Sequence, residues 1–212
     1  MRLYVIRHGD AAHTPYTYGV VKPLTELGVA QARAAGAALR GHGITHIYSS
    51  TVQRTRETAE IIAAALGHSI EHSDDWVEHL IPAIEGMTLE EIREQAPHLA
   101  PDRTDEPWWE RDFGPDGETF PALYDRALRA WNALNERHGT TQDTPLLVTH
   151  GGFADFLLQA ALGIIPSRNL FQFRNTGIAV INTEGGPARI ELLPFEGIGF
   201  AGWGTGDGTR EA

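Results

Sequence analysis

Short apolar runs that alternate with helical patterns constrain the fold of this chain more than any other feature. The first run, residues 3–6, begins almost at the first residue and ends at Arg-His-Gly. Such a run predicts a buried strand that ends in a tight turn. Further strands are expected at 44–48, 145–149, 177–182 and 188–193.

Apolar residues at helical spacing predict helices between these strands. In residues 25–39 they follow a Thr-Glu start, and glycines come directly after the pattern. Other helices are expected at 55–66, 88–95, 119–138 and 153–162. Strands that alternate with helices favour a sheet covered on both faces. The predicted fold class is α/β, a three-layer α/β/α sandwich with a mostly parallel central sheet.

A proline-rich stretch interrupts this alternation. Five prolines lie between Ser73 and Glu118. We expect a small cap insertion at about residues 73–117, within a single domain that spans 1–212. The aromatic residues Trp108, Trp109 and Phe113 would form either a lid or the cap's own small core. Six glycines in residues 197–212 predict a mobile tail.

Composition excludes several classes of function. The chain of 212 residues has no cysteine, which excludes disulfide scaffolds, thiolate metal sites and cysteine nucleophiles. Its 17 Lys and Arg stand against 28 Asp and Glu, so a formal net charge of -11 makes nucleic acid and anionic membranes poor partners. No apolar run is long enough to span a membrane, and no secretory leader is recognisable. A cytoplasmic location is therefore expected, and the oligomeric state is left open.

Candidate functional residues follow the ends of three predicted strands. Arg7-His8-Gly9 follows the first strand, Ser49-Ser50 and then Arg54 follow the second, and His150-Gly151-Gly152 follows the third. Because ligands bind at the carboxyl ends of strands in such sheets, these residues should share one pocket. Arginine forks and helix N-termini bind tetrahedral anions, so the pocket predicts a phosphate.

Six ordered blocks of the sequence resemble the histidine phosphatase superfamily, which includes the phosphoglycerate mutases. The blocks are VIRHGD at 5–10, PLTELGVAQA at 23–32, SSTVQRTRETAEII at 49–62, EGMTLEEI at 85–92, DGET at 116–119 and LLVTHGGF at 146–153. The resemblance implies a phosphatase that works through a phosphohistidine and needs no metal or other cofactor.

The resemblance also assigns roles to residues. His8 would be the nucleophile, Arg7 and Arg54 would bind phosphate oxygens, and a protonated His150 would be the second active-site histidine and phosphate ligand. Counting back from Gly86 in the family's pattern assigns the general acid to Glu78. Glu85 and Glu90 remain substitutes for that role, although acids at a helix start such as Glu90 are more simply partners of the helix dipole.

The resemblance leaves the substrate open. The mutases follow Arg-His-Gly with Glu-Ser-x-Trp-Asn, whereas residues 10–14 here read Asp-Ala-Ala-His-Thr. This difference and the shorter chain favour hydrolysis of a small phosphorylated metabolite. A protein phosphohistidine phosphatase, a phosphoglycerate mutase and a non-catalytic phospholigand-binding module are the alternatives.

Other polar residues have simpler interpretations. His68 and His72 are expected on an exposed strand face rather than at a metal. Asn175 is expected in a turn, and Glu118 at the start of a helix.

Overall fold

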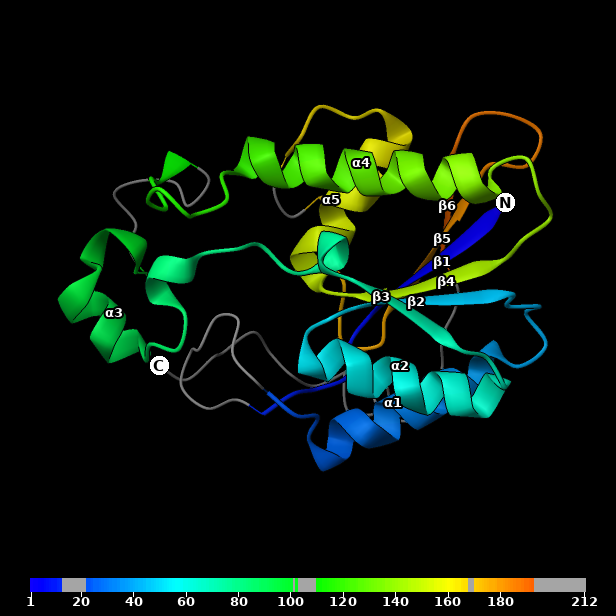
Figure 1. Cartoon of the computed structure of the whole chain (residues 1–212), viewed down its shortest axis with the longest axis horizontal. Coiled ribbons are helices and arrows are strands. Elements are labelled where there is room, and N and C mark those ends of the chain that lie inside the picture. Colours follow the sequence, from blue (N-terminus) through cyan, green and yellow to red (C-terminus); the bar gives the residue numbers. More distant parts are fainter. Residues whose placement is uncertain (13–21, 101, 103–109, 168–169, 193–212) are drawn as a thin grey trace.

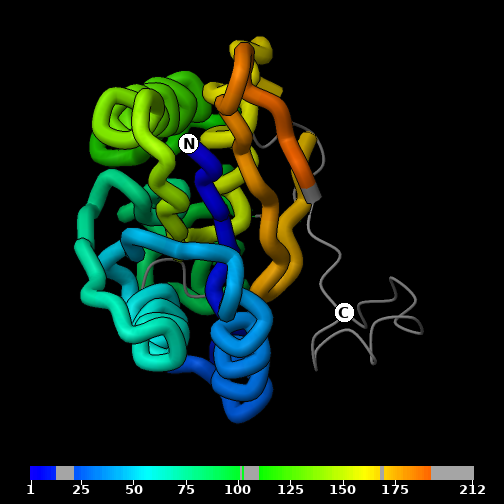
Figure 2. The backbone as a smooth tube through the Cα atoms, turned by 90° about the vertical axis from the view of Figure 1, so that its right-hand side faces the viewer, coloured from blue at the N-terminus to red at the C-terminus, as the bar shows by residue number. Residues whose placement is uncertain are grey.

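The computed structural model describes residues 1–12, 22–100, 102, 110–167 and 170–192. Within this part, a single sheet has the strand order β3-β2-β4-β1-β5-β6. The strands are β1 (Arg2–Arg7), β2 (His46–Ser50), β3 (Ile70–Ser73), β4 (Pro145–Thr149), β5 (Ile178–Asn182) and β6 (Arg189–Leu192). The strands β3, β2, β4 and β1 pair in parallel, and β5 runs antiparallel to both β1 and β6. Figure 2 shows β5 and β6 along one side of β1.

Helices cover both faces of the sheet, as Figure 1 shows. The helices α1 (Glu26–Leu39) and α2 (Gln53–Leu66) lie on one face, and α4 (Phe120–His138) and α5 (Gly151–Leu162) on the other. Successive side chains of β1 alternate between the two cores, because Leu3 and Val5 pack with α4 and α5 while Tyr4 and Ile6 pack with α1 and α2. The predicted α/β/α sandwich with a mostly parallel sheet is confirmed.

The stretch between β3 and α4 builds a hydrophobic cluster of its own. It contains η1 (Asp74–Trp76), η2 (Pro82–Ile84), α3 (Leu89–Gln95) and η3 (Pro97–Leu99), and α3 projects beyond the sheet in Figure 1. A capping box of Thr88 and Glu91 starts α3. Phe113 is buried in this cluster, so its ring belongs to the small core rather than to a lid. Trp108 and Trp109 lie outside the described residues.

Several element boundaries differ from the sequence-based expectation. β2 ends at Ser50 instead of residue 48, because Ser49 and Ser50 continue the strand as fully buried residues. Helix α5 begins at Gly151 instead of residue 153, because Gly151 and Gly152 form its first turn. The predicted tail at 197–212 lies outside the described residues.

Candidate active site

Two histidines meet where β1 and β4 end. These strands are parallel neighbours with Arg7 opposite Thr149, so His8 and His150 follow at the same edge of the sheet. The two imidazole rings are edge to face, with centroids 5.3 Å apart. His8 is nearly buried and His150 fully buried. The predicted convergence of the two strand ends is therefore present in the fold.

Arg54 lies between the two rings and fixes their tautomers. It comes from the first turn of α2, and its Nε donates to His8 Nε2 at 3.1 Å. Its Nη2 lies 3.0 Å from His150 Nδ1. A guanidinium can only donate, so both of these ring nitrogens accept and carry no proton. The proton of His8 is then on Nδ1, which donates to the Gly9 carbonyl at 2.7 Å.

A close backbone approach holds the turn that carries His8. A Cβ atom on Gly28 would lie 1.9 Å from the Asp10 carbonyl oxygen, so only glycine fits at this position of α1. The Gly9 N–H donates to Thr58 Oγ1 on α2. The turn after β1 is therefore fixed against both helices of one face.

His150 is neutral in this arrangement, which differs from the expected protonated state. Burial and the neighbouring Arg54, His8 and Arg7 hold the pKa of His150 well below its usual range. Its Nε2 carries the proton and donates to Ser50 Oγ at 2.9 Å. Ser50 was expected in the pocket, after the second predicted strand, but without a specific role.

Arg7 also faces the pocket. Its Nη1 donates to the Phe173 carbonyl at 2.7 Å, while its Nε is buried and has no hydrogen-bond partner among the described residues. Burial lowers the pKa of Arg7, although the charges of Glu78 and Asp10 oppose this effect. A buried N–H donor without a partner costs free energy unless a ligand accepts from it.

The turn before β5 supports the end of β1. Asn175 donates from Nδ2 to the His8 carbonyl at 3.1 Å, so it orients the histidine's backbone as well as forming the expected turn. Thr176 adopts a left-handed conformation, with φ of 54°, and its N–H donates to the carbonyl of Arg7. Such strain persists only where the surrounding structure enforces it.

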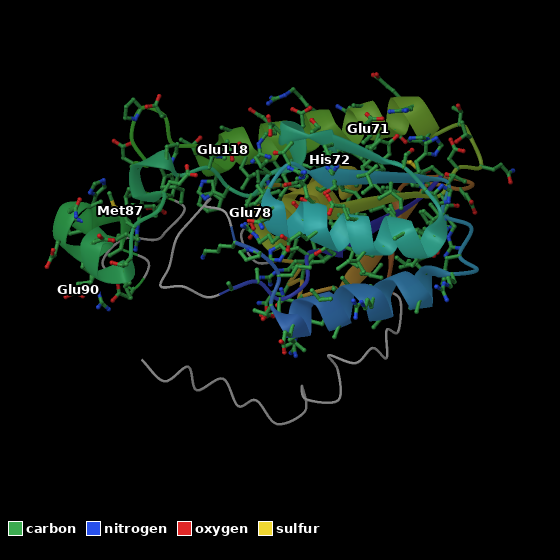
Figure 3. All side chains as sticks on the ribbon, turned by 60° about the horizontal axis from the view of Figure 1, so that its bottom comes forward. Glu71, His72, Glu78, Met87, Glu90 and Glu118 are labelled. Atoms are coloured by element: carbon green, nitrogen blue, oxygen red, sulfur yellow. The ribbon has the colours of Figure 1, made fainter. Side chains whose placement is uncertain are left out.

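Glu78 lies at the N-terminus of α5. Its carboxylate accepts from the backbone N–H groups of Gly152 at 3.1 Å and Phe153 at 3.0 Å, and from His79 at 3.0 Å. Its charge acts on both Arg7 and Arg54. Figure 3 shows Glu78 beside the sheet and Glu90 on the outlying α3. Of these two carboxylates, only Glu78 adjoins the histidine pocket.

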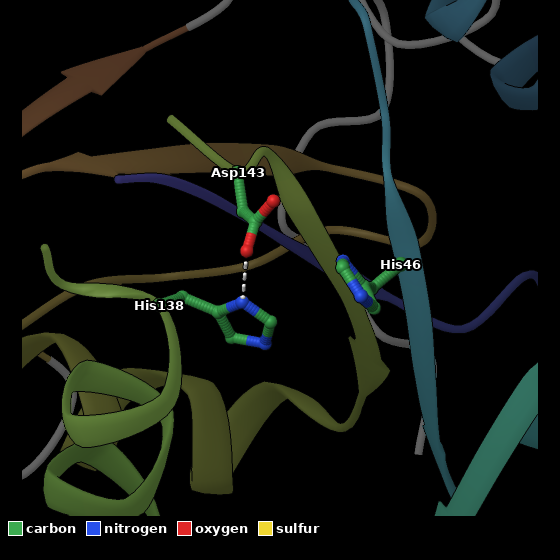
Figure 4. A group of neighbouring side chains, drawn as sticks. All are labelled: His46, His138 and Asp143. Atoms are coloured by element: carbon green, nitrogen blue, oxygen red, sulfur yellow. Dashed lines mark hydrogen bonds and ion pairs between the residues drawn. The ribbon is translucent and has the colours of Figure 1, made fainter. Parts of the chain in front are cut away.

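A possible metal-ligand group lies at the opposite ends of the strands. It consists of His46, His138 and Asp143, whose ligand atoms lie within 4.8 Å of one another (Figure 4). His138 has both nitrogens engaged, with Asp143 Oδ2 at 2.8 Å and the Tyr48 hydroxyl at 2.8 Å. His138 therefore has no ring nitrogen left for a metal ion, and its hydrogen bond to Tyr48 links α4 to β2.

His68 and His72, the other two histidines considered as metal ligands, belong to no such group within the described ranges. His72 is exposed on β3, as expected. His68 is half-buried and precedes the strand, so the two do not share one strand face.

The fold and the pocket of His8, Arg54 and His150 define a class of α/β protein whose site lies at the carboxyl ends of parallel strands. A family model described as histidine phosphatase superfamily (branch 1) matches residues 3–195. The chain belongs to this superfamily, and the resemblance seen in its sequence blocks is confirmed.

The similarity to other proteins covers most of the chain. A protein of Salmonella arizonae named probable phosphoglycerate mutase GpmB is 31% identical over 196 residues, covering 87% of this chain and 86% of that protein. The structure of YhfR from Bacillus stearothermophilus has a TM-score of 0.77 and 27% identity, covering 90% of this chain and 95% of that one. A putative alpha-ribazole-5'-P phosphatase from Escherichia coli has a TM-score of 0.79 at 21% identity, covering 91% and 95%. At that identity, the likeness concerns the fold alone.

Proposed function

We propose that this chain is a metal-independent phosphomonoester hydrolase that works through a phosphohistidine on His8. The observation that carries the proposal is the unprotonated Nε2 of His8, held at 3.1 Å from Arg54 Nε. A neutral imidazole with a fixed tautomer is a competent nucleophile. Arg54 can transfer its two donors from the histidines to the phosphate oxygens when substrate enters.

The first step transfers the phosphoryl group to the enzyme. His8 Nε2 attacks phosphorus, a P–N bond forms, and the P–O bond to the leaving alcohol breaks. Arg7 and Arg54 stabilise the charge on the equatorial oxygens. Glu78 acts as the general acid and gives a proton to the leaving oxygen.

The second step releases inorganic phosphate. Glu78, now a carboxylate, accepts a proton from water, and the hydroxyl oxygen attacks the phosphohistidine. The P–N bond breaks and its electron pair returns to His8. Each residue is thus restored to its starting state.

The substrate we propose is a small phosphorylated metabolite. The alternative of a phosphoglycerate mutase is supported by the names of relatives such as the Salmonella protein. A mutase returns the phosphoryl group to a second hydroxyl, whereas a hydrolase passes it to water. The protein phosphohistidine phosphatase, the binding module and the cytoplasmic location stay sequence-based predictions. No helix in the described part of the chain is long and apolar enough to cross a membrane.

A panel of phosphorylated metabolites, with 3-phosphoglycerate and a phosphohistidine peptide included, tests the proposal. We expect release of inorganic phosphate from at least one small monoester. Isomerised phosphoglycerate without phosphate release would favour the mutase. Turnover of the peptide alone would favour the protein phosphatase, and binding without turnover would favour the binding module.

A further inference from the structure

A buried ion pair lies behind the segment that carries Glu78. Arg126 on α4 and Glu118, just before that helix, have side chains only 9% and 10% exposed. Arg126 Nε donates to Glu118 Oε1 and its Nη2 to Oε2, both at 2.7 Å. A buried pair of this kind gains little net stability over apolar side chains, which suggests another role for its geometry.

Arg126 also donates hydrogen bonds to backbone carbonyls of residues 75–78, which follow β3. Nη1 donates to the carbonyls of Asp75 at 3.0 Å and Val77 at 2.9 Å, and Nη2 to the carbonyl of Glu78 at 3.3 Å. The guanidinium also lies 5.0 Å from the ring centre of Phe153. Phe153 is the residue whose N–H binds the Glu78 carboxylate. Arg126 therefore contacts both the main chain of Glu78 and a residue that binds its side chain.

Glu118 binds the next two residues of this segment, His79 and Leu80. Its Oε2 accepts from the Leu80 N–H at 3.3 Å, and its own N–H donates to the Leu80 carbonyl at 2.8 Å. The Glu118 carbonyl accepts from His79 Nε2 at 2.5 Å. Burial lowers the pKa of His79, so this ring is a neutral donor. Figure 3 shows Glu118 and Glu78 toward the same end of the molecule.

We propose that Arg126 and Glu118 are positioning residues that hold Glu78 at the N-terminus of α5. The inference rests on the proposed function, in which Glu78 moves the proton. Residues 77–81 have no regular secondary structure, so their own hydrogen bonds do not fix them. The planar guanidinium of Arg126 fixes these residues, because it binds three backbone carbonyls and the Glu118 carboxylate at the same time.

The test compares substitutions that alter the fork with a matched control on the same helix. Arg126→Lys keeps the charge but cannot make the two parallel bonds to Glu118 together with the carbonyl contacts. The control is Arg137→Lys, because Arg137 also belongs to α4 and pairs with Glu71, but both side chains are more than half exposed.

The readout is the single-turnover rate of phosphorylation with an alkyl phosphate and with p-nitrophenyl phosphate. The nitrophenolate leaves without a proton, so only the alkyl substrate depends on Glu78. We expect Arg126→Lys to slow the alkyl substrate about 10- to 100-fold and the nitrophenyl substrate less than about threefold, with KM unchanged. Arg137→Lys should leave both rates unchanged.

A double variant separates positioning from a general structural role. If Arg126 acts through Glu78, Arg126→Lys should cause no further loss in a Glu78→Gln background. Equal slowing of the two substrates, or losses that multiply in the double variant, would overturn the inference. If Arg126→Lys shows no cooperative thermal unfolding, the variant is not folded and Glu118→Gln is used in its place. The amide oxygen of the glutamine can still accept one hydrogen bond from Arg126.

The outcome also separates this inference from the proposed function. If Glu78→Gln alone shows no preference between leaving groups, the acid role of Glu78 fails and the positioning inference fails with it. If Glu78→Gln shows the preference and neither Arg126→Lys nor Glu118→Gln does, only the positioning inference is overturned.

Discussion

Arg54 is the residue that decides how the two pocket histidines carry their protons. It donates to His8 Nε2 and His150 Nδ1, so each histidine has an unprotonated nitrogen facing the same guanidinium. The sequence predicted that His8, Arg54 and His150 would share a pocket from their places after strand ends. It could not predict the neutral state of His150, because that depends on burial and on cations brought together by the fold.

The low pKa of His150 predicts a linkage between anion binding and proton uptake. A tetrahedral dianion raises the pKa of a histidine beside it, so His150 should take up a proton on binding. Affinity for sulfate should then fall as pH rises, by up to about tenfold per pH unit between the free and bound pKa values. Titration calorimetry in buffers of different ionisation enthalpy measures the uptake. His150→Asn should remove it, and uptake that persists in this variant would assign the proton to another group.

The acid role of Glu78 predicts a rate loss that depends on the leaving group. General acid catalysis contributes about 10² to 10⁴ in rate when the leaving oxygen needs a proton. Glu78→Gln should slow phosphorylation by an alkyl phosphate by such a factor and leave p-nitrophenyl phosphate nearly unaffected in single-turnover measurements. An equal loss with both substrates would mean that Glu78 shapes the pocket without moving a proton.

At the scale of elements, the start of α5 shows where sequence reasoning reaches its limit. The helix was expected from residue 153, but it also includes two successive glycines, which have low helix propensity. They belong to α5 because the Glu78 carboxylate lies against the N–H groups of its first turn. That contact joins residues far apart in sequence and leaves no local signal. The antiparallel direction of β5 beside β1 is equally a property of long-range pairing.

The same helix start offers a matched pair of glycine substitutions. A Cβ on Gly152 would lie 2.5 Å from Glu78 Oε1, whereas the nearest atoms to one on Gly151 belong to Arg7, with Cδ at 3.5 Å. Gly152→Ala should change stability little, because the helix propensity that alanine adds, up to about 1 kcal/mol, offsets the hydrogen bonds that the displaced carboxylate loses. It should nevertheless slow the alkyl substrate at least about tenfold, by displacing the carboxylate.

Gly151→Ala is the comparison for this prediction. It leaves Glu78 in place, so any effect on rate should be equal for alkyl and nitrophenyl substrates. Denaturant unfolding and single-turnover rates measure the two properties separately. A Gly152→Ala variant with a normal alkyl rate would show that the carboxylate contact with α5 is unimportant for turnover.

At the scale of the whole molecule, the sheet order explains why the pocket forms where it does. β4 lies between β1 and β2, so the ends of all three strands deliver His8, Ser50 and His150 to one edge. The alternation of strands and helices was enough to predict this layered fold. Between β3 and α4, the helix at 88–95 was predicted, but the 3₁₀ turns η2 and η3 were not, because they depend on the small core around Phe113.

Metal independence is a prediction about the assembled pocket. Arg7 and Arg54 provide the positive charge that a divalent cation would otherwise supply, and Glu78 is engaged with α5. Hydrolysis rates measured before and after dialysis against EDTA should agree. A loss of activity that Mg²⁺ or Zn²⁺ restores would contradict this expectation and assign part of the charge stabilisation to a metal.

Trapping of the covalent intermediate tests the account most directly. Substrate labelled in the phosphoryl group should be mixed rapidly with enzyme, quenched without acid, and digested for mass spectrometry. We expect the label on His8, bound through Nε2, and we expect His8→Ala to show neither the adduct nor turnover. Turnover at a normal kcat by His8→Ala, or label found on another residue, would contradict the phosphohistidine mechanism.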